Sequence, residues 1–173
     1  MTDAYPLDQT AAIPADDIAA AWRRELDGVP THSIPVVTPI WRLAKLLADE
    51  RRRFLTEQGV DAATLDLIST LRRDGEPYRL TTRELAERCL VSAGAISQRV
   101  ARAEKDGLVT RGPAGGRPKS VAVTLTSAGH DLTDALVGEL LRREAALIGD
   151  GDHTALAAGL RELLAGVTSR LAQ

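Results

Sequence analysis

The sequence predicts a mainly α-helical fold with a small β-wing. Of the 173 residues, 44% are hydrophobic and only 3% are aromatic. The core therefore has to be built from Leu, Ala, Val and Ile, which favours packed helices over a β-sandwich. Apolar residues recur at three-, four- and seven-residue spacing, as they do on one face of a helix. Strand-like alternation of apolar and polar residues is found at residues 121–126.

The N-terminal part is expected to hold a tail, a short helix and a long helix. Residues 1–15 are polar and show no periodicity, so they are expected to be a disordered tail. A short helix is expected over residues 16–27, capped by Asp16 or Asp17. A linker rich in Gly and Pro separates it from a long helix that is expected over residues 36–57.

The middle of the chain predicts three further helices. Asp61 is expected to cap a helix over residues 62–73. Thr81 or Thr82 is expected to cap the next helix, and Glu84 stands at the capping-box spacing from Thr81. A short turn, LVSAG, then leads into a second helix with the sequence AISQRVARAEKDG, which Gly107 closes.

A β-hairpin and two closing helices are predicted after that second helix. Residues 108–111 and 121–126 are expected to pair as strands joined by GPAGGRPK. Helices at 127–148 and 153–171 then complete the chain. The order helix, turn, helix and basic hairpin makes a winged helix-turn-helix, which contacts duplex DNA at two adjacent grooves.

The charge pattern supports DNA binding by this segment. Between Arg83 and Lys119 there are eight positive and four negative residues, although the whole chain carries a net charge of −2. Phosphate binding requires such a local excess. In the major groove, Gln98 is expected to read adenine, and Arg102 to read guanine or hold a phosphate. The full set of expected DNA contacts is Ser92, Ala93, Gly94, Ser97, Gln98 and Arg102 on the second helix, with Arg117 and Lys119 at the hairpin tip.

The motif is carried by three segments, LTTRELAER, LVSAGAISQRVARAEKDGLVTR and VAVTLTSAGHDL. Together they resemble the MarR family of winged-helix transcriptional regulators. The resemblance implies a homodimer joined through its N- and C-terminal helices, a palindromic double-stranded DNA operator, and repression that a small anionic molecule relieves. The wing departs from the family pattern, because AGGRPKS keeps Arg117 but lacks the usual Asp. The implied organisation is a single domain over residues 16–173, with an additional helix at 16–27, dimerisation helices at 36–60 and 127–173, and a DNA-binding lobe at 61–126.

A narrower resemblance is to the urate-responsive branch of this family, which has an additional N-terminal helix carrying a Trp. The matching residues are Trp22, Asp66 and Arg73, which the resemblance implies as ligand contacts, and Arg99 as the link to the DNA-binding helix. Asp66 and Arg73 are seven residues apart, so they share one helix face about 10 Å apart. A urate- or purine-like anion is the expected effector, and a small carboxylate or phenolic ligand is an alternative.

Other functions have less support in the sequence. A winged-helix module that binds protein and not DNA remains an alternative. No catalytic set or phosphate-binding glycine loop is visible, so neither an enzyme nor a cofactor is expected. The three histidines, His32, His130 and His153, lack metal-ligand spacing, and Cys89 is expected to be a buried structural thiol. Without an apolar run long enough to span a membrane, the protein is expected to be cytoplasmic.

Overall fold

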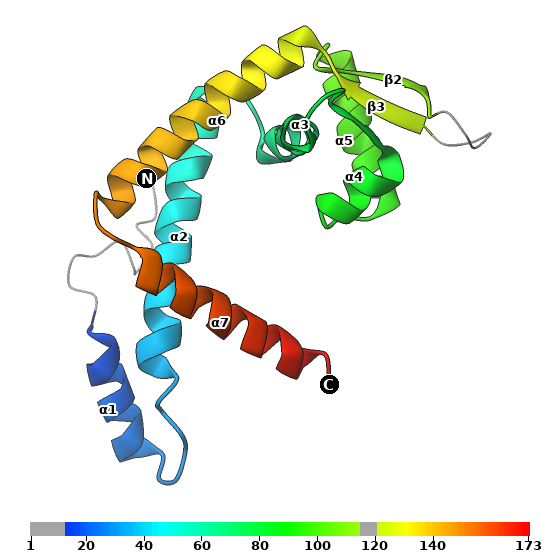
Figure 1. Ribbon diagram of the computed structural model, residues 1–173. Helices are drawn as coiled ribbons and strands as arrows, with labels where there is room; N and C mark the ends of the chain where they lie inside the picture. The colour runs from blue at the N-terminus through cyan, green and yellow to red at the C-terminus, as the bar shows by residue number, and fades with distance from the viewer. Residues whose placement is uncertain (1–12, 115–120) are drawn as a thin grey trace, which may run out of the picture.

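A computed structural model describes residues 13–114 and 121–173 and confirms a mainly helical fold with a small sheet (Figure 1). The predicted helices are all present, and their bounds agree with the prediction or differ by one or two residues. The elements are α1 (Ala15–Glu25), α2 (Ile34–Glu57), α3 (Ala62–Asp74), β1 (Arg79–Thr81), α4 (Thr82–Arg88), α5 (Ala93–Lys105), β2 (Val109–Pro113), β3 (Val121–Leu125), α6 (Ser127–Ile148) and α7 (Thr154–Leu171).

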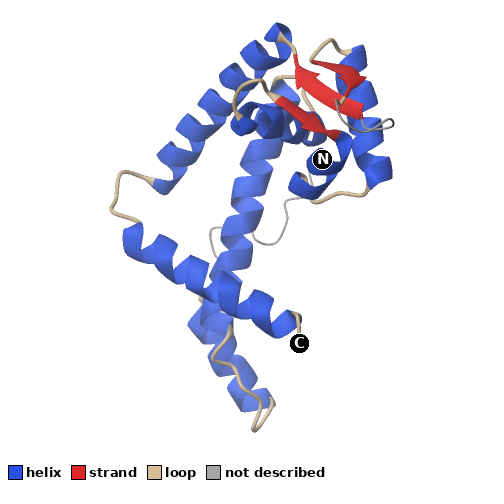
Figure 2. Cartoon of the chain, turned by 45° about the vertical axis from the view of Figure 1, so that its right-hand side comes forward, coloured by secondary structure: helices blue, strands red, loops and turns tan. Residues whose placement is uncertain are grey.

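The elements form a lobe and an elongated helical arm (Figures 1 and 2). The lobe contains α3, α4, α5 and the sheet. The long helices α2 and α6 lead away from it, and α1 packs along the part of α2 that is farthest from α3. After α6 the chain turns, and α7 crosses α2 in both views. The arm is thus built from the first and last helices of the chain.

The sheet has three antiparallel strands in the order β1-β3-β2. The hairpin pairs Val109 with Leu125, as expected for a wing. Sequence analysis missed β1, which adds to the other edge of β3 with Arg79 opposite Thr124. Three residues are too few for an alternating pattern to be recognised. The tip of the hairpin, residues 115–120, lies outside the described residues.

The core of the lobe is aliphatic, as the composition predicts. The helix α5 buries Ile96, Val100 and Ala103, the stripe on its inner face, against α3 and the sheet. The long helix α2 contributes to this core only near its C-terminal end, where Phe54 is buried. The apolar Leu43, further back along α2, is exposed in the protomer.

Helix caps account for the starts of α3 and α4. The Asp61 carboxylate accepts a hydrogen bond from the Thr64 backbone N–H at 2.9 Å, which confirms it as the cap of α3. Thr81, and not Thr82, caps α4. The Glu84 N–H donates to the Thr81 hydroxyl at 3.2 Å, and the Thr81 N–H donates to the Glu84 carboxylate at 2.8 Å. This reciprocal pair is a complete capping box.

The start of α1 differs from the prediction. Pro14 is its N-cap residue and makes no side-chain cap, so the expectation that Asp16 or Asp17 caps this helix is wrong. Both carboxylates lie in the first turn, where they favour the helix dipole. Of the expected tail, residues 1–12 lie outside the described residues, and Ala15 already belongs to α1. The helix α2 begins at Ile34, two residues early, because Pro35 fits a first helical turn.

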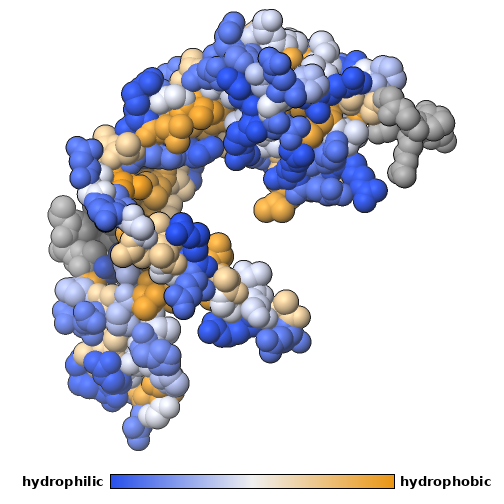
Figure 3. Space-filling view, in the orientation of Figure 1, coloured by the Kyte–Doolittle hydropathy of each residue, from blue (hydrophilic) through white to orange (hydrophobic). Residues whose placement is uncertain are grey.

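Large apolar side chains are exposed along the arm. Figure 3 shows them along α6 and around the crossing of α7 and α2. No residue of α7 is buried, and its Leu164 is 67% exposed. Trp41 on α2 is 70% exposed. A contiguous apolar surface of this kind is typical of a protein–protein interface.

Candidate nucleic-acid interface and effector cleft

The expected major-groove residues lie together on the outer face of α5. Ser92, Ala93, Gly94, Ser97, Gln98 and Arg102 are all exposed, opposite the buried stripe. Ser92 is the N-cap of α5, and its hydroxyl accepts a hydrogen bond from the Ala95 N–H at 3.3 Å. The Ser97 hydroxyl donates to the Ala93 carbonyl at 2.8 Å, so its oxygen keeps lone pairs that face outward. Small residues at this end of the helix let the backbone approach a nucleic-acid groove.

Ion pairs reduce the free positive charge of this face. Each of the five arginines between residues 83 and 111 has a carboxylate partner. The pairs are Arg83–Glu87, Arg88–Asp74, Arg99–Asp66, Arg102–Asp61 and Arg111–Glu104. Three of these acids lie on α3 or at its cap, outside the window in which the excess of four was counted. Exposed pairs of this kind contribute about 1 kcal/mol or less, so a phosphate can replace the acid.

The wing holds one cation that sequence analysis missed. Arg79 on β1 donates a hydrogen bond to the Pro113 carbonyl at the end of β2. Its guanidinium therefore lies beside the hairpin, and only the β1–β3 pairing places it there. Arg117 and Lys119 lie outside the described residues, and their expected contacts remain predictions.

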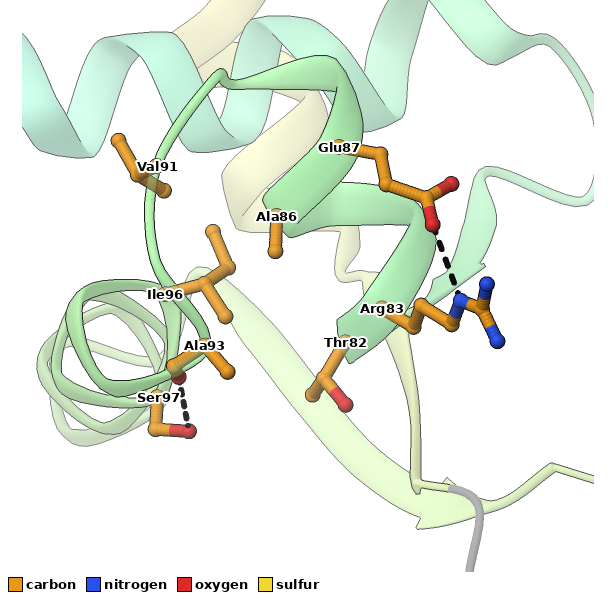
Figure 4. Close-up of a pocket in the computed structure, with 8 residues that line it drawn as sticks. All are labelled: Thr82, Arg83, Ala86, Glu87, Val91, Ala93, Ile96 and Ser97. Carbon is orange, nitrogen blue, oxygen red and sulfur yellow. Dashed lines mark hydrogen bonds and ion pairs between the residues drawn. The ribbon is translucent and has the colours of Figure 1, made fainter.

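A groove of about 370 Å³ separates α4 from α5 (Figure 4). Ala86 and Ile96 face each other across it, and the Arg83–Glu87 ion pair, at 2.9 Å, lies on the outer side of α4. The groove adjoins the exposed face of α5 through Ala93 and Ser97. It belongs to the helix-turn-helix surface that is expected to meet DNA.

The structure brings Asp66 and Arg99 together. The Arg99 guanidinium donates to the Asp66 carboxylate at 2.7 Å, between α5 and α3. Cys89 lies beside this pair, and its thiol donates to the Thr70 hydroxyl at 3.6 Å. Cys89 is only partly buried, but burial is the main reason that the pKa of its thiol is raised. A raised pKa disfavours the reactive thiolate.

Arg73 forms no ion pair with Asp66 in the structure. Its guanidinium donates within α3, to the Ser69 carbonyl and the Thr70 hydroxyl, at 3.2 Å each. It also lines a cleft of about 400 Å³ between α3 and α6. Asp66 does not line this cleft, so the shared helix face does not make one site of the two residues.

The α3–α6 cleft combines an apolar floor with a charged rim. The floor contains Leu65, Val137 and Leu140. On the rim, Arg72 donates from two nitrogens to the two Asp134 oxygens, at 2.8 and 3.2 Å. Arg51 and Glu144 approach less closely, at 3.8 Å. The Arg72 hydrogen bonds lower the pKa of Asp134.

Trp22 is not part of this cleft in the protomer. It lies on α1, is 49% exposed, and is separated from α3 by most of the length of α2 (Figure 1). The structure therefore places Asp66 against Arg99, and it places Arg73 at the cleft. Within one chain, Trp22 lies near neither the ion pair nor the cleft.

Two further kinds of feature are absent from the described part of the chain. No group of three or more His, Cys, Asp or Glu side chains there is arranged to hold a metal ion. No helix within residues 13–114 and 121–173 is both long enough and apolar enough to cross a membrane.

Comparisons with known proteins agree with this geometry. A model of the MarR family matches residues 58–117, the segment from α3 through the wing. The HTH-type transcriptional regulator PecS of Dickeya dadantii is 25% identical over 132 residues, which cover 76% of this chain and 80% of PecS.

Two solved structures have the same fold. One is NadR in complex with 4-hydroxyphenylacetate, with a TM-score of 0.58 and 21% identity, covering 80% of this chain and 92% of NadR. The other is a cysteine-to-serine mutant of MarR from E. coli complexed with operator DNA. It has a TM-score of 0.58 and 24% identity, and the match covers 74% of this chain and 94% of the MarR chain. Over the segment from α3 through the wing the chain is therefore similar to MarR-family proteins, and the two solved structures share its winged-helix fold.

Proposed function

We propose that the protein is a homodimeric repressor that binds a palindromic DNA operator and is released by a small anionic effector. The observation that carries DNA binding is the exposed face of α5, which presents small residues, Gln98 and Arg102 beside an antiparallel wing. Support also comes from the MarR structure that holds operator DNA on the same fold. The recognition helix α5 would enter the major groove, with half-sites about one helical turn apart.

The dimer rests on the apolar surface of the arm. The helix α7 buries no side chain in the protomer, although Leu160, Leu163 and Leu164 recur along it at helical spacing. Covering this face with a second copy removes that apolar area from water, which is the main favourable term in association. Sedimentation or light scattering is expected to give twice the monomer mass of 18.5 kDa.

DNA binding is tested with a fluorescently labelled fragment from the region upstream of the protein's own gene. Binding is expected to weaken steeply with salt, because counterions are released from the phosphates. Arg102→Ala and Arg117→Ala are each expected to weaken binding by about 1 kcal/mol or more and to leave the dimer intact. Absence of binding at low salt would instead favour a winged-helix protein-interaction module, an alternative that the paired arginines of this face also favour.

The effector site includes Arg73, the cleft arginine whose described hydrogen bonds stay within its own helix. Trp22 would reach the site only from a second protomer, so its expected contact requires the dimer. The Asp66–Arg99 ion pair would carry the effect of the ligand to α5. Urate or another purine is favoured through the resemblance. A small aromatic carboxylate is the alternative, and NadR holds such a ligand.

Effector binding is tested by the melting temperature in the presence of urate, other purines and 4-hydroxyphenylacetate. A true effector raises the melting temperature, because it binds only the folded state. Trp22 emission is read in a Trp41→Phe background, since these are the two tryptophans of the chain. Binding that survives both Trp22→Ala and Arg73→Ala would contradict the proposed contacts.

A further inference from the structure

We propose that Asp134 is a built-in competitor of the effector, holding Arg72 until the acidic group of the effector takes its place. This inference rests on the proposed function and adds the way in which the cleft is regulated. The competitor and the ligand would use the same guanidinium, so a bound effector and a closed Arg72–Asp134 pair exclude each other.

The geometry of the pair is that of ligand recognition. Arg72 meets Asp134 through its Nε and one terminal nitrogen, at 2.8 and 3.2 Å. Two parallel bonds from a planar guanidinium are how arginine recognises a free carboxylate or a similar planar anion. The two side chains are 33% and 48% exposed, so water reaches the pair and an incoming anion can displace the aspartate.

The surroundings of the pair indicate the class of ligand. Arg73 lies on the same rim and adds a second positive charge. Leu65, Val137 and Leu140 form an apolar floor below. The ligand that fits this arrangement is a small flat ring with one acidic group, which pairs with Arg72 and Arg73 while the ring covers the floor.

Arg72 also supports the wing from behind. Its guanidinium carbon lies 5.1 Å from the centre of the Tyr78 ring, and this ring meets His130 of α6 edge-on at 5.3 Å. The Tyr78 carbonyl accepts a hydrogen bond from the Leu125 N–H at 3.0 Å, at the end of β3. Arg72, a residue of α3, thus contacts α6 through Asp134 and the segment before β1 through Tyr78. A ligand that takes Arg72 from Asp134 withdraws its support from Tyr78 and loosens the wing relative to α6.

The test is Asp134→Asn, measured for DNA affinity and for binding of urate and 4-hydroxyphenylacetate in the full-length dimer. Two opposite changes are expected. DNA affinity without ligand falls by about fivefold, because the pair no longer holds the wing. Affinity for at least one probe rises by about fivefold, because the internal competitor is weakened. Asp131→Asn is the matched control, since it removes the same charge three residues away from a side chain that is 86% exposed.

The outcomes separate this inference from the proposed function. If Asp134→Asn weakens both DNA and probe binding, Asp134 is only structural and the inference is overturned. It is also overturned if the variant behaves like Asp131→Asn, or if DNA is bound but neither probe binds to wild type or variant. If wild type binds no DNA, the proposed repressor fails, while the probe measurements still decide whether Asp134 competes.

Discussion

Replacing Gly129 with alanine is expected to destabilise the junction between the recognition helix and the arm. Gly129 lies in the first turn of α6, where this helix starts against the loop that follows α5. A Cβ atom at this position would lie 2.1 Å from the Leu108 carbonyl oxygen and 2.8 Å from a methyl group of Leu125. The carbonyl cannot yield easily, because it accepts the Thr126 N–H at 3.1 Å.

The size of the effect follows from these distances. Contacts of Cβ below 3.0 Å are essentially never observed, so the two backbone segments have to separate by about 1 Å. Overpacking costs about 1–3 kcal/mol, and a backbone obstacle places the cost near 3 kcal/mol. Alanine regains up to about 1 kcal/mol through its better helix propensity. The net loss of about 2 kcal/mol corresponds to a melting temperature lower by about 4–8 °C for a chain of this length.

The assay is urea and thermal denaturation at a fixed protein concentration, because unfolding of a dimer depends on concentration. Gly138→Ala is the control on the same helix. Its added methyl group would meet only the mobile end of Arg142, at 3.7 Å, so it is expected to be neutral or to stabilise by up to about 1 kcal/mol. Equal stability of the two variants would refute the close approach at Gly129.

Three other perturbations have defined outcomes. Asp61→Asn keeps a good cap for α3 but removes the charge that pairs with Arg102 at 3.1 Å, so DNA affinity is expected to rise about threefold, measured by anisotropy. Hydrogen bonds from the Thr81 N–H and hydroxyl lower the pKa of Glu84, so its stabilising effect is present at neutral pH and is lost as the pH falls through that lowered pKa. Glu84→Gln is expected to flatten this part of the stability–pH curve. Cys89, whose pKa is raised, should react with iodoacetamide more slowly in the folded protein than in urea. Equal rates would contradict its shielding.

Sequence reasoning succeeds where neighbours along the chain determine structure. The Thr81 capping box and the Ile96–Val100 stripe are both local, because a cap joins residues three apart and a helix face repeats every three to four residues. It fails for β1, whose three residues are a strand only because β3 lies beside them. Pairing at a distance leaves no local pattern.

The candidate site shows the same division. The seven-residue spacing of Asp66 and Arg73 places both on one side of α3 but does not determine their partners. Arg99, 33 residues away, holds Asp66, and Arg73 turns to the Thr70 hydroxyl and the cleft. Asp134, 62 residues from Arg72, completes the cleft rim. Such partners depend on the packing of α3 against α5 and α6, which one sequence alone does not specify.

The ion pairs of α3 give the proposed effector a route to the proposed DNA-binding face. The segment from Asp61 to Asp74 is paired with each neighbouring helix. The pairs are Asp61–Arg102 and Asp66–Arg99 to α5, Asp74–Arg88 to α4, and Arg72–Asp134 to α6.

Each exposed pair is worth about 1 kcal/mol or less, so none of them alone fixes the position of α5. If several of these ion pairs change together, the summed change in free energy is about 1–3 kcal/mol. This is the usual coupling energy between an effector site and a second site. If the proposed effector takes Arg72 and moves α3, the contacts of Arg99 and Arg102 are expected to change, and these two side chains lie on α5, the helix that we propose to read DNA.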